Sequence, residues 1–207
     1  MQNKIIVAGI GPGNKSYITP AALEKIQAAK FLVGGRRALA DFANPTQETF
    51  PITADLNSVT NFISTKLLLD DVVIMVSGDP GYYSFLSFLK KNFTNAIEVI
   101  PSISAMQLAF AKLSLTWESA TLLSFHGRQP SEQKLQFEVG KVLGLLTDAE
   151  FNSATISKIL LNLGWKKNSN LAILSKLSYP DEEIILTTLE DAVHSPEVKH
   201  CILIVGF

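Results

Sequence analysis

Short apolar runs alternate with longer amphipathic stretches through the first half of the chain. The short runs are rich in branched residues, which is typical of strands, and the longer stretches have the apolar spacing of helices. The predicted strands are 4–8, 31–33, 72–77 and 97–100, and the predicted helices are 20–29, 58–69, 83–91 and 104–113. This order predicts an α/β fold with a mostly parallel sheet and helices on both of its faces.

The pattern changes after Thr116. The predicted strands are then 121–125, 142–146, 171–174, 183–187 and 201–205, and the predicted helices are a polar one at 131–139 and an apolar one at 154–163. The last two strands have no long helix between them, which indicates a mixed sheet. We therefore expect two α/β domains, residues 1–115 and 116–207, with a cleft between them.

Composition narrows the class of protein. The 207 residues are 47% apolar, which describes a compact globular chain with a sizeable core. The 18 basic and 19 acidic residues leave no positive excess, so a general nucleic-acid partner is not expected. No apolar run approaches the roughly 18 residues of a membrane span, so we expect no membrane partner. The single cysteine, Cys201, excludes an internal disulfide, and a cytoplasmic protein is expected. The three histidines have no neighbours at metal-ligand spacing, so no metal is expected.

Three loops rich in small residues follow strands of the first half: Gly9-Ile10-Gly11-Pro12-Gly13, Ser77-Gly78-Asp79-Pro80-Gly81-Tyr82-Tyr83 and Pro101-Ser102-Ile103-Ser104-Ala105. In a parallel sheet the carboxyl ends of the strands lie at one edge, where α/β proteins bind small molecules. Each loop alone could be an ordinary turn without a ligand. Together they predict a ligand site at that edge.

A dinucleotide site is the first alternative. Its fingerprint requires a Gly-x-Gly-x-x-Gly turn that runs directly into a helix, and an acidic residue after the second strand. Here Gly9, Gly11 and Gly13 are spaced by two, and the next helix begins only near Pro20. The second strand ends in Gly34-Gly35-Arg36-Arg37. This pattern disfavours a dinucleotide, although an NADP-linked oxidoreductase with arginines on the 2′-phosphate stays open as an alternative.

The loop sequences resemble a known family. Gly9-Ile10-Gly11-Pro12-Gly13, Thr19-Pro20-Ala21-Ala22 and Leu32-Val33-Gly34-Gly35-Arg36 look like the opening of the tetrapyrrole (corrin/porphyrin) methylases. Ser77-Gly78-Asp79-Pro80 and Pro101-Ser102-Ile103-Ser104-Ala105 match its second and third motifs in order and spacing. The resemblance covers essentially the whole chain. Ser124-Phe125-His126-Gly127-Arg128 is similar to a signature of the branch that methylates C5 of precorrin-6Y or cobalt-precorrin-7. Asn14 is a departure, because many members carry Asp there.

The resemblance implies S-adenosylmethionine as cofactor and C5 methylation of a corrin precursor in cobalamin biosynthesis. It implies donor-binding positions in both halves of the chain: Pro12, Gly78, Asp79, Tyr82, Ser102, Ile103, Leu145, Leu146, Thr147 and Ala172. Asp79 would bond polar groups of the donor or favour its sulfonium charge. Another acceptor within the family, such as the diphthamide precursor or ribosomal RNA, stays open as an alternative.

The implied acceptor is a large anionic tetrapyrrole, so its site needs cations. Arg36, Arg37 and Arg128 are candidates because guanidinium groups fit carboxylates, although Arg36 and Arg37 could equally be a solvated surface pair. His126 could bond a carboxylate or carry a proton, and it is the single candidate catalytic residue. The resemblance also implies a homodimer. Some relatives carry a fused methylase for C15 methylation and decarboxylation. The resemblance of this chain covers only the C5 part and the sequence ends at Phe207, so we expect it to act at C5 alone. A separate C15 enzyme is a candidate partner.

Overall fold

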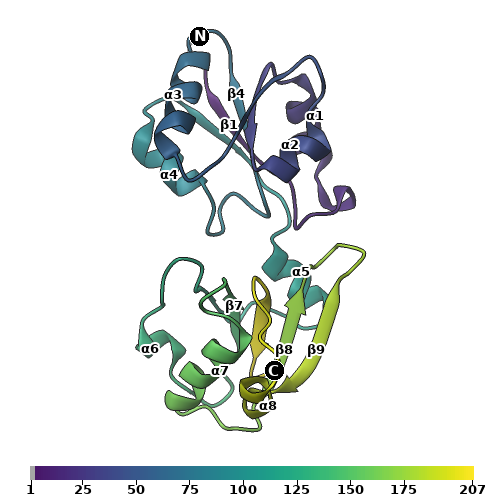
Figure 1. Cartoon of the computed structure of the whole chain (residues 1–207), viewed down its shortest axis with the longest axis vertical. Coiled ribbons are helices and arrows are strands. Elements are labelled where there is room, and N and C mark those ends of the chain that lie inside the picture. The colour runs from purple at the N-terminus through teal and green to yellow at the C-terminus, as the bar shows by residue number, and fades with distance from the viewer. Residues whose placement is uncertain (1–2) are drawn as a thin grey trace. The chain divides into compact units, whose positions relative to one another are not determined.

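The computed structural model describes residues 3–207, which form two compact α/β units (Figure 1). The first unit extends to Ser104 and the second is Ala105–Phe207, and each is described by itself. The sequence places the domain boundary near Thr116, one helix later than this division.

The first unit is built on a five-stranded parallel sheet with the strand order β3-β2-β4-β1-β5. The strands are β1 (Ile5–Gly9), β2 (Phe31–Gly34), β3 (Glu48–Pro51), β4 (Val72–Val76) and β5 (Ile97–Ile100). Ile5 pairs with Val72 on one side and with Ile97 on the other, so β1 lies between β4 and β5. The predicted parallel sheet is confirmed, and β1 and β4 are buried over their whole length.

The helices of the first unit are α1 (Pro20–Ala28), α2 (Arg36–Phe42), α3 (Leu56–Lys66) and α4 (Leu86–Asn92), with a 3₁₀ turn η1 at Lys15–Tyr17. The Thr19 hydroxyl accepts the Ala22 N–H, and Pro20 occupies the first helical position, as the sequence predicts. The sequence missed α2 and the exposed, partly polar edge strand β3. It also began α4 too early, because Tyr83 has a left-handed backbone with φ 48° that a helix cannot contain.

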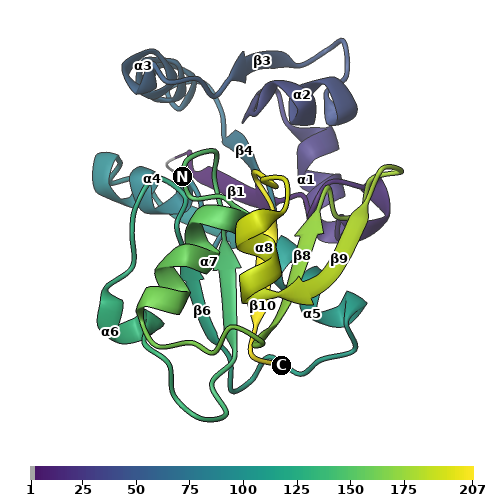
Figure 2. The ribbon, with the colours of Figure 1, turned by 60° about the horizontal axis from the view of Figure 1, so that its bottom comes forward.

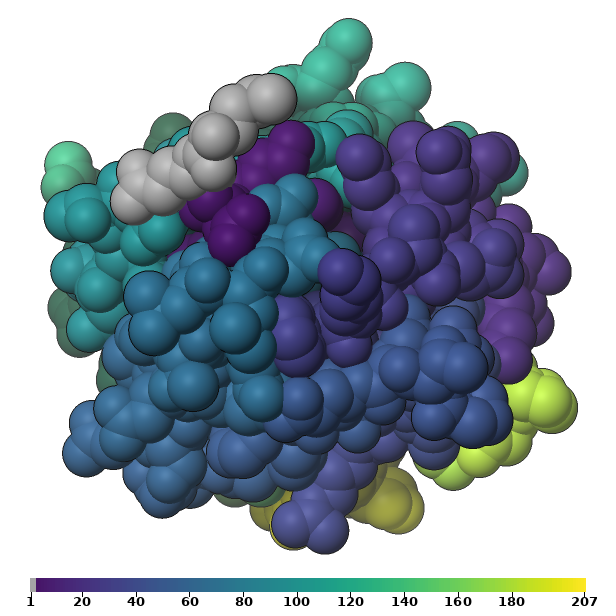
Figure 3. Space-filling view, turned by 90° about the horizontal axis from the view of Figure 1, so that it is seen from above, coloured from purple at the N-terminus to yellow at the C-terminus, as the bar shows by residue number. Residues whose placement is uncertain are grey.

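Alternate residues of the parallel sheet point into two separate cores. Ile5, Val7 and Ile74 pack with α3 and α4, whereas Ile6, Ala8 and Met75 pack with α1 and α2. Figure 3 shows a surface formed largely by the helices and loops of this unit, in purple and blue. Because both faces are covered, only the ends of the strands remain available for a ligand site.

The second unit is built on a mixed sheet with the order β6-β7-β10-β8-β9. Its strands are β6 (Thr121–Ser124), β7 (Leu143–Leu146), β8 (Asn170–Ser175), β9 (Glu183–Thr188) and β10 (Ile202–Val205), and its helices are α5 (Ala105–Lys112), α6 (Glu132–Leu135), α7 (Ser153–Asn162) and α8 (Leu189–His194). Only β6 and β7 are parallel, while β10 and β9 run antiparallel to their neighbours. The predicted mixed sheet is confirmed, and Figure 2 shows β8 beside β9.

Two helices of the second unit depart from the sequence prediction. Helix α6 ends at Leu135 because Gln136 is extended, with ψ 142°, so the predicted helix 131–139 is too long. The short α8 was not predicted. Helix α5 packs on β10 and β7. A Cβ at Gly144 of β7 would lie 2.7 Å from the Met106 sulfur and 3.0 Å from Phe110, so the glycine allows this close approach.

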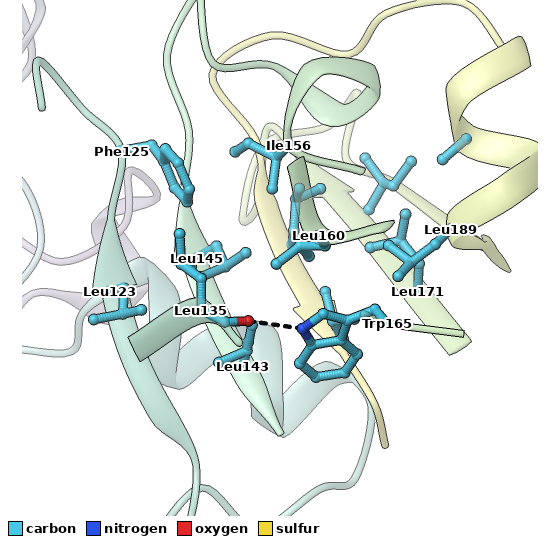
Figure 4. Close-up of a cluster of buried hydrophobic side chains, with 14 of the residues drawn as sticks. Leu123, Phe125, Leu135, Leu143, Leu145, Ile156, Leu160, Trp165, Leu171 and Leu189 are labelled. Atoms are coloured by element: carbon cyan, nitrogen blue, oxygen red, sulfur yellow. Dashed lines mark hydrogen bonds between the residues drawn. The ribbon is translucent and has the colours of Figure 1, made fainter. Parts of the chain in front are cut away.

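An apolar core lies between one face of the second sheet and the helices α6, α7 and α8 (Figure 4). Phe125, directly after β6, and Leu145 of β7 meet Ile156 and Leu160 of α7, and all four are fully buried. The Trp165 indole closes the cluster, and its Nε1–H donates to the Leu135 carbonyl at 2.7 Å. The buried indole therefore has its polar atom satisfied while its ring fills the core.

Candidate functional site

The loops after β1, β4 and β5 meet at the carboxyl edge of the first sheet, as the sequence predicts. Gly11 and Gly78 form an isolated antiparallel bridge, in which the Gly78 N–H donates to the Gly11 carbonyl at 2.8 Å. Pro12 follows directly and is half-buried. The first two loops are thus joined through their backbones.

Gly9 lies where all three loops converge. A Cβ at this position would be 2.7 Å from the Gly78 carbonyl oxygen, 2.7 Å from the Ser102 Cβ and 2.8 Å from the Pro80 Cδ. Two of these atoms are rigidly held, in a backbone carbonyl and a proline ring. Only glycine permits this convergence, so the glycine of the first strand end is required by packing.

Asp79 ties the second loop to the third. One carboxylate oxygen accepts the Gly81 N–H at 2.7 Å, and the other accepts the Ser102 N–H at 3.0 Å. The side chain is half-buried. The family resemblance predicts that Asp79 bonds polar groups of a donor. In the structure, both of its oxygens hold backbone N–H groups of the site.

Tyr17 of η1 also belongs to the loop cluster, and sequence reasoning did not select it. Its carbonyl accepts a hydrogen bond from the Ser102 hydroxyl at 3.4 Å. A Cβ at Gly11, where φ is 76°, would approach the same carbonyl to 3.0 Å. The Asn14 side chain accepts the Ser16 N–H at 2.8 Å and caps η1. Asn14 thus performs a capping role that an aspartate could also perform.

The segment after Asp79 is tightly folded. The Tyr82 N–H donates to the Asp79 carbonyl at 3.1 Å, and the Ser84 hydroxyl donates to the Pro80 carbonyl. The Tyr82 hydroxyl is buried and has no hydrogen-bond partner among the described residues. Burial raises the pKa of Tyr82 far above its usual value, so the phenol is neutral. An unsatisfied buried hydroxyl is a candidate for a polar ligand contact.

The candidate positions of the second unit lie at the end of β7 and within β8. Leu145 and Ala172 are fully buried and Leu146 is half-buried. The Thr147 hydroxyl donates to the Cys201 carbonyl at 2.9 Å and accepts the Cys201 N–H at 2.8 Å. The side chains of Leu145, Thr147 and Ala172 are therefore committed to the interior, which leaves backbone groups for any ligand contact.

The His126-Gly127-Arg128 segment forms an exposed turn after β6. The Gly127 N–H donates to Asp148 at 3.0 Å, and the other Asp148 oxygen accepts the Glu150 and Phe151 N–H groups. These bonds, first of all that from Gly127, lower the pKa of Asp148. Sequence reasoning did not select Asp148, although an aspartate shortly after a strand end, here two residues after β7, is typical of such turns.

Arg36 and Arg37 are exposed and form the first turn of α2, directly after β2. They lie in the first unit, and Arg128 lies in the second. No group of three or more His, Cys, Asp or Glu that could hold a metal ion occurs within residues 3–207. No helix in that range combines the length and apolar character needed to cross a membrane.

Comparisons with known proteins identify the family of this chain and similar folds. The family described as Tetrapyrrole (Corrin/Porphyrin) Methylases matches residues 4–193. The probable cobalt-precorrin-7 C(5)-methyltransferase of Methanocaldococcus jannaschii is 29% identical, over 90% of this chain and 90% of that protein. The cobalt-precorrin-7 C(5)-methyltransferase of Salmonella typhimurium is 32% identical, over 87% of this chain and 88% of that protein.

A similar fold is found in the uroporphyrin-III C-methyl transferase of Thermus thermophilus, solved in complex with S-adenyl homocysteine. The TM-score is 0.78 at 18% identity, and the match covers 99% of this chain and 97% of that one. At this identity the likeness concerns the fold.

Proposed function

Given that this chain belongs to the tetrapyrrole methylases, we propose that it transfers a methyl group from S-adenosylmethionine to C5 of a corrin precursor in cobalamin biosynthesis. The acceptor is cobalt-precorrin-7 or precorrin-6Y. The similar proteins named cobalt-precorrin-7 C(5)-methyltransferase support this ring position. The observation that carries the proposal is the convergence of three strand-end loops on Gly9.

The residues of the first unit fit a methyl donor of this kind. When bound, S-adenosylmethionine supplies an activated methyl group on a sulfonium centre. The Tyr82 hydroxyl can bond a polar group of the donor, because it is buried and unsatisfied. Backbone groups at Gly78, Ser102 and Ile103 lie in loops that Asp79 holds together. Asp79 is thus a positioning residue, and the half-buried Pro12 shapes the floor of the site.

Main-chain groups at Leu145, Leu146, Thr147 and Ala172 are also proposed to contact the donor, as the family resemblance implies. The twofold hydrogen bonding between Thr147 and Cys201 supports this role, because it fixes the chain directly after β7. A fixed backbone holds the reacting partners in line, and alignment alone lowers the barrier by about 7 kcal/mol or more in well-oriented reactions.

The acceptor is proposed to be held by cations and oriented by one turn. Arg36, Arg37 and Arg128 bind its carboxylates, and His126 bonds the acceptor or takes a proton after transfer. The anchoring of Gly127 by Asp148 supports this role, because it fixes the turn between His126 and Arg128. We further propose a cytoplasmic homodimer, with a separate C15 methylase and decarboxylase as partner.

Methyl transfer to a defined acceptor tests the proposal. The purified protein is incubated with S-adenosylmethionine carrying a ¹³C-labelled methyl group and with cobalt-precorrin-7, and the product is examined by mass spectrometry and NMR. One added methyl group at C5 is expected. The metal-free analogue, run in parallel, decides whether cobalt is required. Binding of the donor without transfer to either acceptor would contradict the C5 assignment.

A further inference from the structure

A cavity of about 280 Å³ lies at the carboxyl ends of β2 and β4 in the first unit. Residues on its walls include Gly35, Ala38, Ile52, Met75, Tyr83 and Phe85. Tyr83 and the adjoining Ser84 belong to the same loop as Gly78 and Asp79. The cavity therefore shares a wall with the loops proposed to hold the methyl donor.

We propose that this cavity receives one apolar edge of the tetrapyrrole acceptor, and that Gly35 and Tyr83 determine which ring edge it admits. The inference rests on the proposed function, because it concerns the acceptor of that reaction. Pockets for whole small molecules span roughly 300–1,000 Å³, so 280 Å³ is at the lower limit. A macrocycle with its side chains is too large, whereas one pyrrole-derived ring with its methyl groups fits.

The chemistry of the walls matches such an edge. Ala38, Ile52 and Met75 are apolar, and no carboxylate lines the cavity within the part of the chain that the structure describes. Arg36 and Arg37 follow Gly35 directly and are exposed. A site with an apolar interior and cations beside it complements an apolar ring whose margin carries carboxylates.

Tyr83, which lines the cavity, has a strained backbone. Its φ of 48° places it in the left-handed region, which is unfavourable for a bulky residue. The residue is 46% exposed, so burial does not explain the strain. The ring stands edge-on to Tyr82, with centroids 4.9 Å apart. A partly exposed aromatic ring at a cavity wall is suited to contact the face of a conjugated ligand.

Gly35 lines the cavity at the start of α2. A Cβ added there would meet no atom within 4 Å. Its φ of −60° and ψ of 150° suit any residue, so the backbone does not require glycine. Gly35 is exposed and lines the cavity, so a larger side chain there would begin in open space at the cavity wall. Gly35→Leu therefore adds apolar bulk at this wall without a clash at its Cβ.

The test compares wild type with Gly35→Leu, Tyr83→Asn and the control Ala40→Leu. Ala40 lies on the same helix α2 and is exposed, and it does not line the cavity. Asparagine tolerates a left-handed backbone, so Tyr83→Asn removes the ring and keeps the loop. For Gly35→Leu we expect the acceptor KM to rise about tenfold or more. Tyr83→Asn should raise it several-fold. The dissociation constant for S-adenosylmethionine and the melting temperature should stay unchanged in all three.

A second measurement separates this inference from the proposed function. Binding of uroporphyrin III, a carboxylate-rich tetrapyrrole, is followed by its absorbance and fluorescence, which requires no methyl transfer. Weaker binding by Gly35→Leu, with Ala40→Leu equal to wild type, supports the cavity even if C5 methylation fails. Equal binding by Gly35→Leu and wild type, or no binding by wild type, overturns the inference. An unchanged acceptor KM in Gly35→Leu overturns it as well.

Discussion

Removal of the Asp79 carboxylate is the most direct test of how the site is assembled. Its two oxygens accept the Gly81 and Ser102 N–H groups at 2.7 Å and 3.0 Å. Hydrogen bonds to a charged group contribute about 1.5–3 kcal/mol each, and the lower value applies here because the site is partly exposed. We expect Asp79→Ala to lower the free energy of unfolding by about 3 kcal/mol, and Asp79→Asn by about half of that because an amide has one acceptor oxygen.

The measurement combines thermal unfolding with calorimetric titration of S-adenosylmethionine. About 2–4 °C per kcal/mol for a chain of this size gives a fall in Tm of roughly 6–12 °C for Asp79→Ala. The affinity for the donor should also fall, because the loops after β4 and β5 are no longer joined through the Asp79 carboxylate. Asp55→Ala is a matched control, since the Asp55 carboxylate caps α3 and bonds the Ser58 N–H and hydroxyl rather than the three loops. It should lose stability without losing donor affinity.

Two results would refute this reasoning. If Asp79→Ala kept its stability but lost donor affinity, the carboxylate would act by direct contact with the donor. If both quantities stayed unchanged, the two hydrogen bonds would not hold the loops together.

Substitutions at Gly9, Cys201 and Arg128 test a close backbone contact, a buried thiol and an exposed cation. Gly9→Ala should cost about 1–3 kcal/mol and weaken donor binding, measured by urea unfolding and calorimetry, because its Cβ would lie 2.7 Å from the Gly78 carbonyl oxygen. An unchanged unfolding midpoint would contradict the convergence of the loops. Burial raises the pKa of the Cys201 thiol from 9.0 to about 11, so the unfolded chain releases this proton first and stability falls as the pH rises between these values. Cys201→Ala should remove that part of the slope, and an identical slope in both proteins would argue against it. Arg128→Ala should raise the acceptor KM several-fold in steady-state kinetics, and a change confined to donor affinity would exclude its proposed role.

Local signals in the sequence determined most of the fold. The continuous apolar runs at β1 and β4 predict buried parallel strands, and Thr19-Pro20 predicts the start of α1, because these features depend on neighbouring residues alone. The failures lie where local signals are weak. Strand β3 is exposed and α2 is short, so neither has a strong apolar period.

The meeting of the three loops could be predicted from the sequence, because parallel strands deliver their following loops to one edge. The hydrogen-bond partners of the residues in those loops depend on the tertiary structure. The sequence cannot show that Asp79 bonds the Ser102 N–H, since the two residues meet only when β4 and β5 lie on either side of β1. The hydrogen bond from the Ser102 hydroxyl to the Tyr17 carbonyl likewise joins residues that are far apart in the sequence.

Features that depend on residue type alone, such as glycine turns and arginine pairs, can thus be recognised in the sequence. The partners of a side chain depend on which distant strands the sheet brings together. That choice is made by burial of apolar surface over the whole unit, and no single motif contains it.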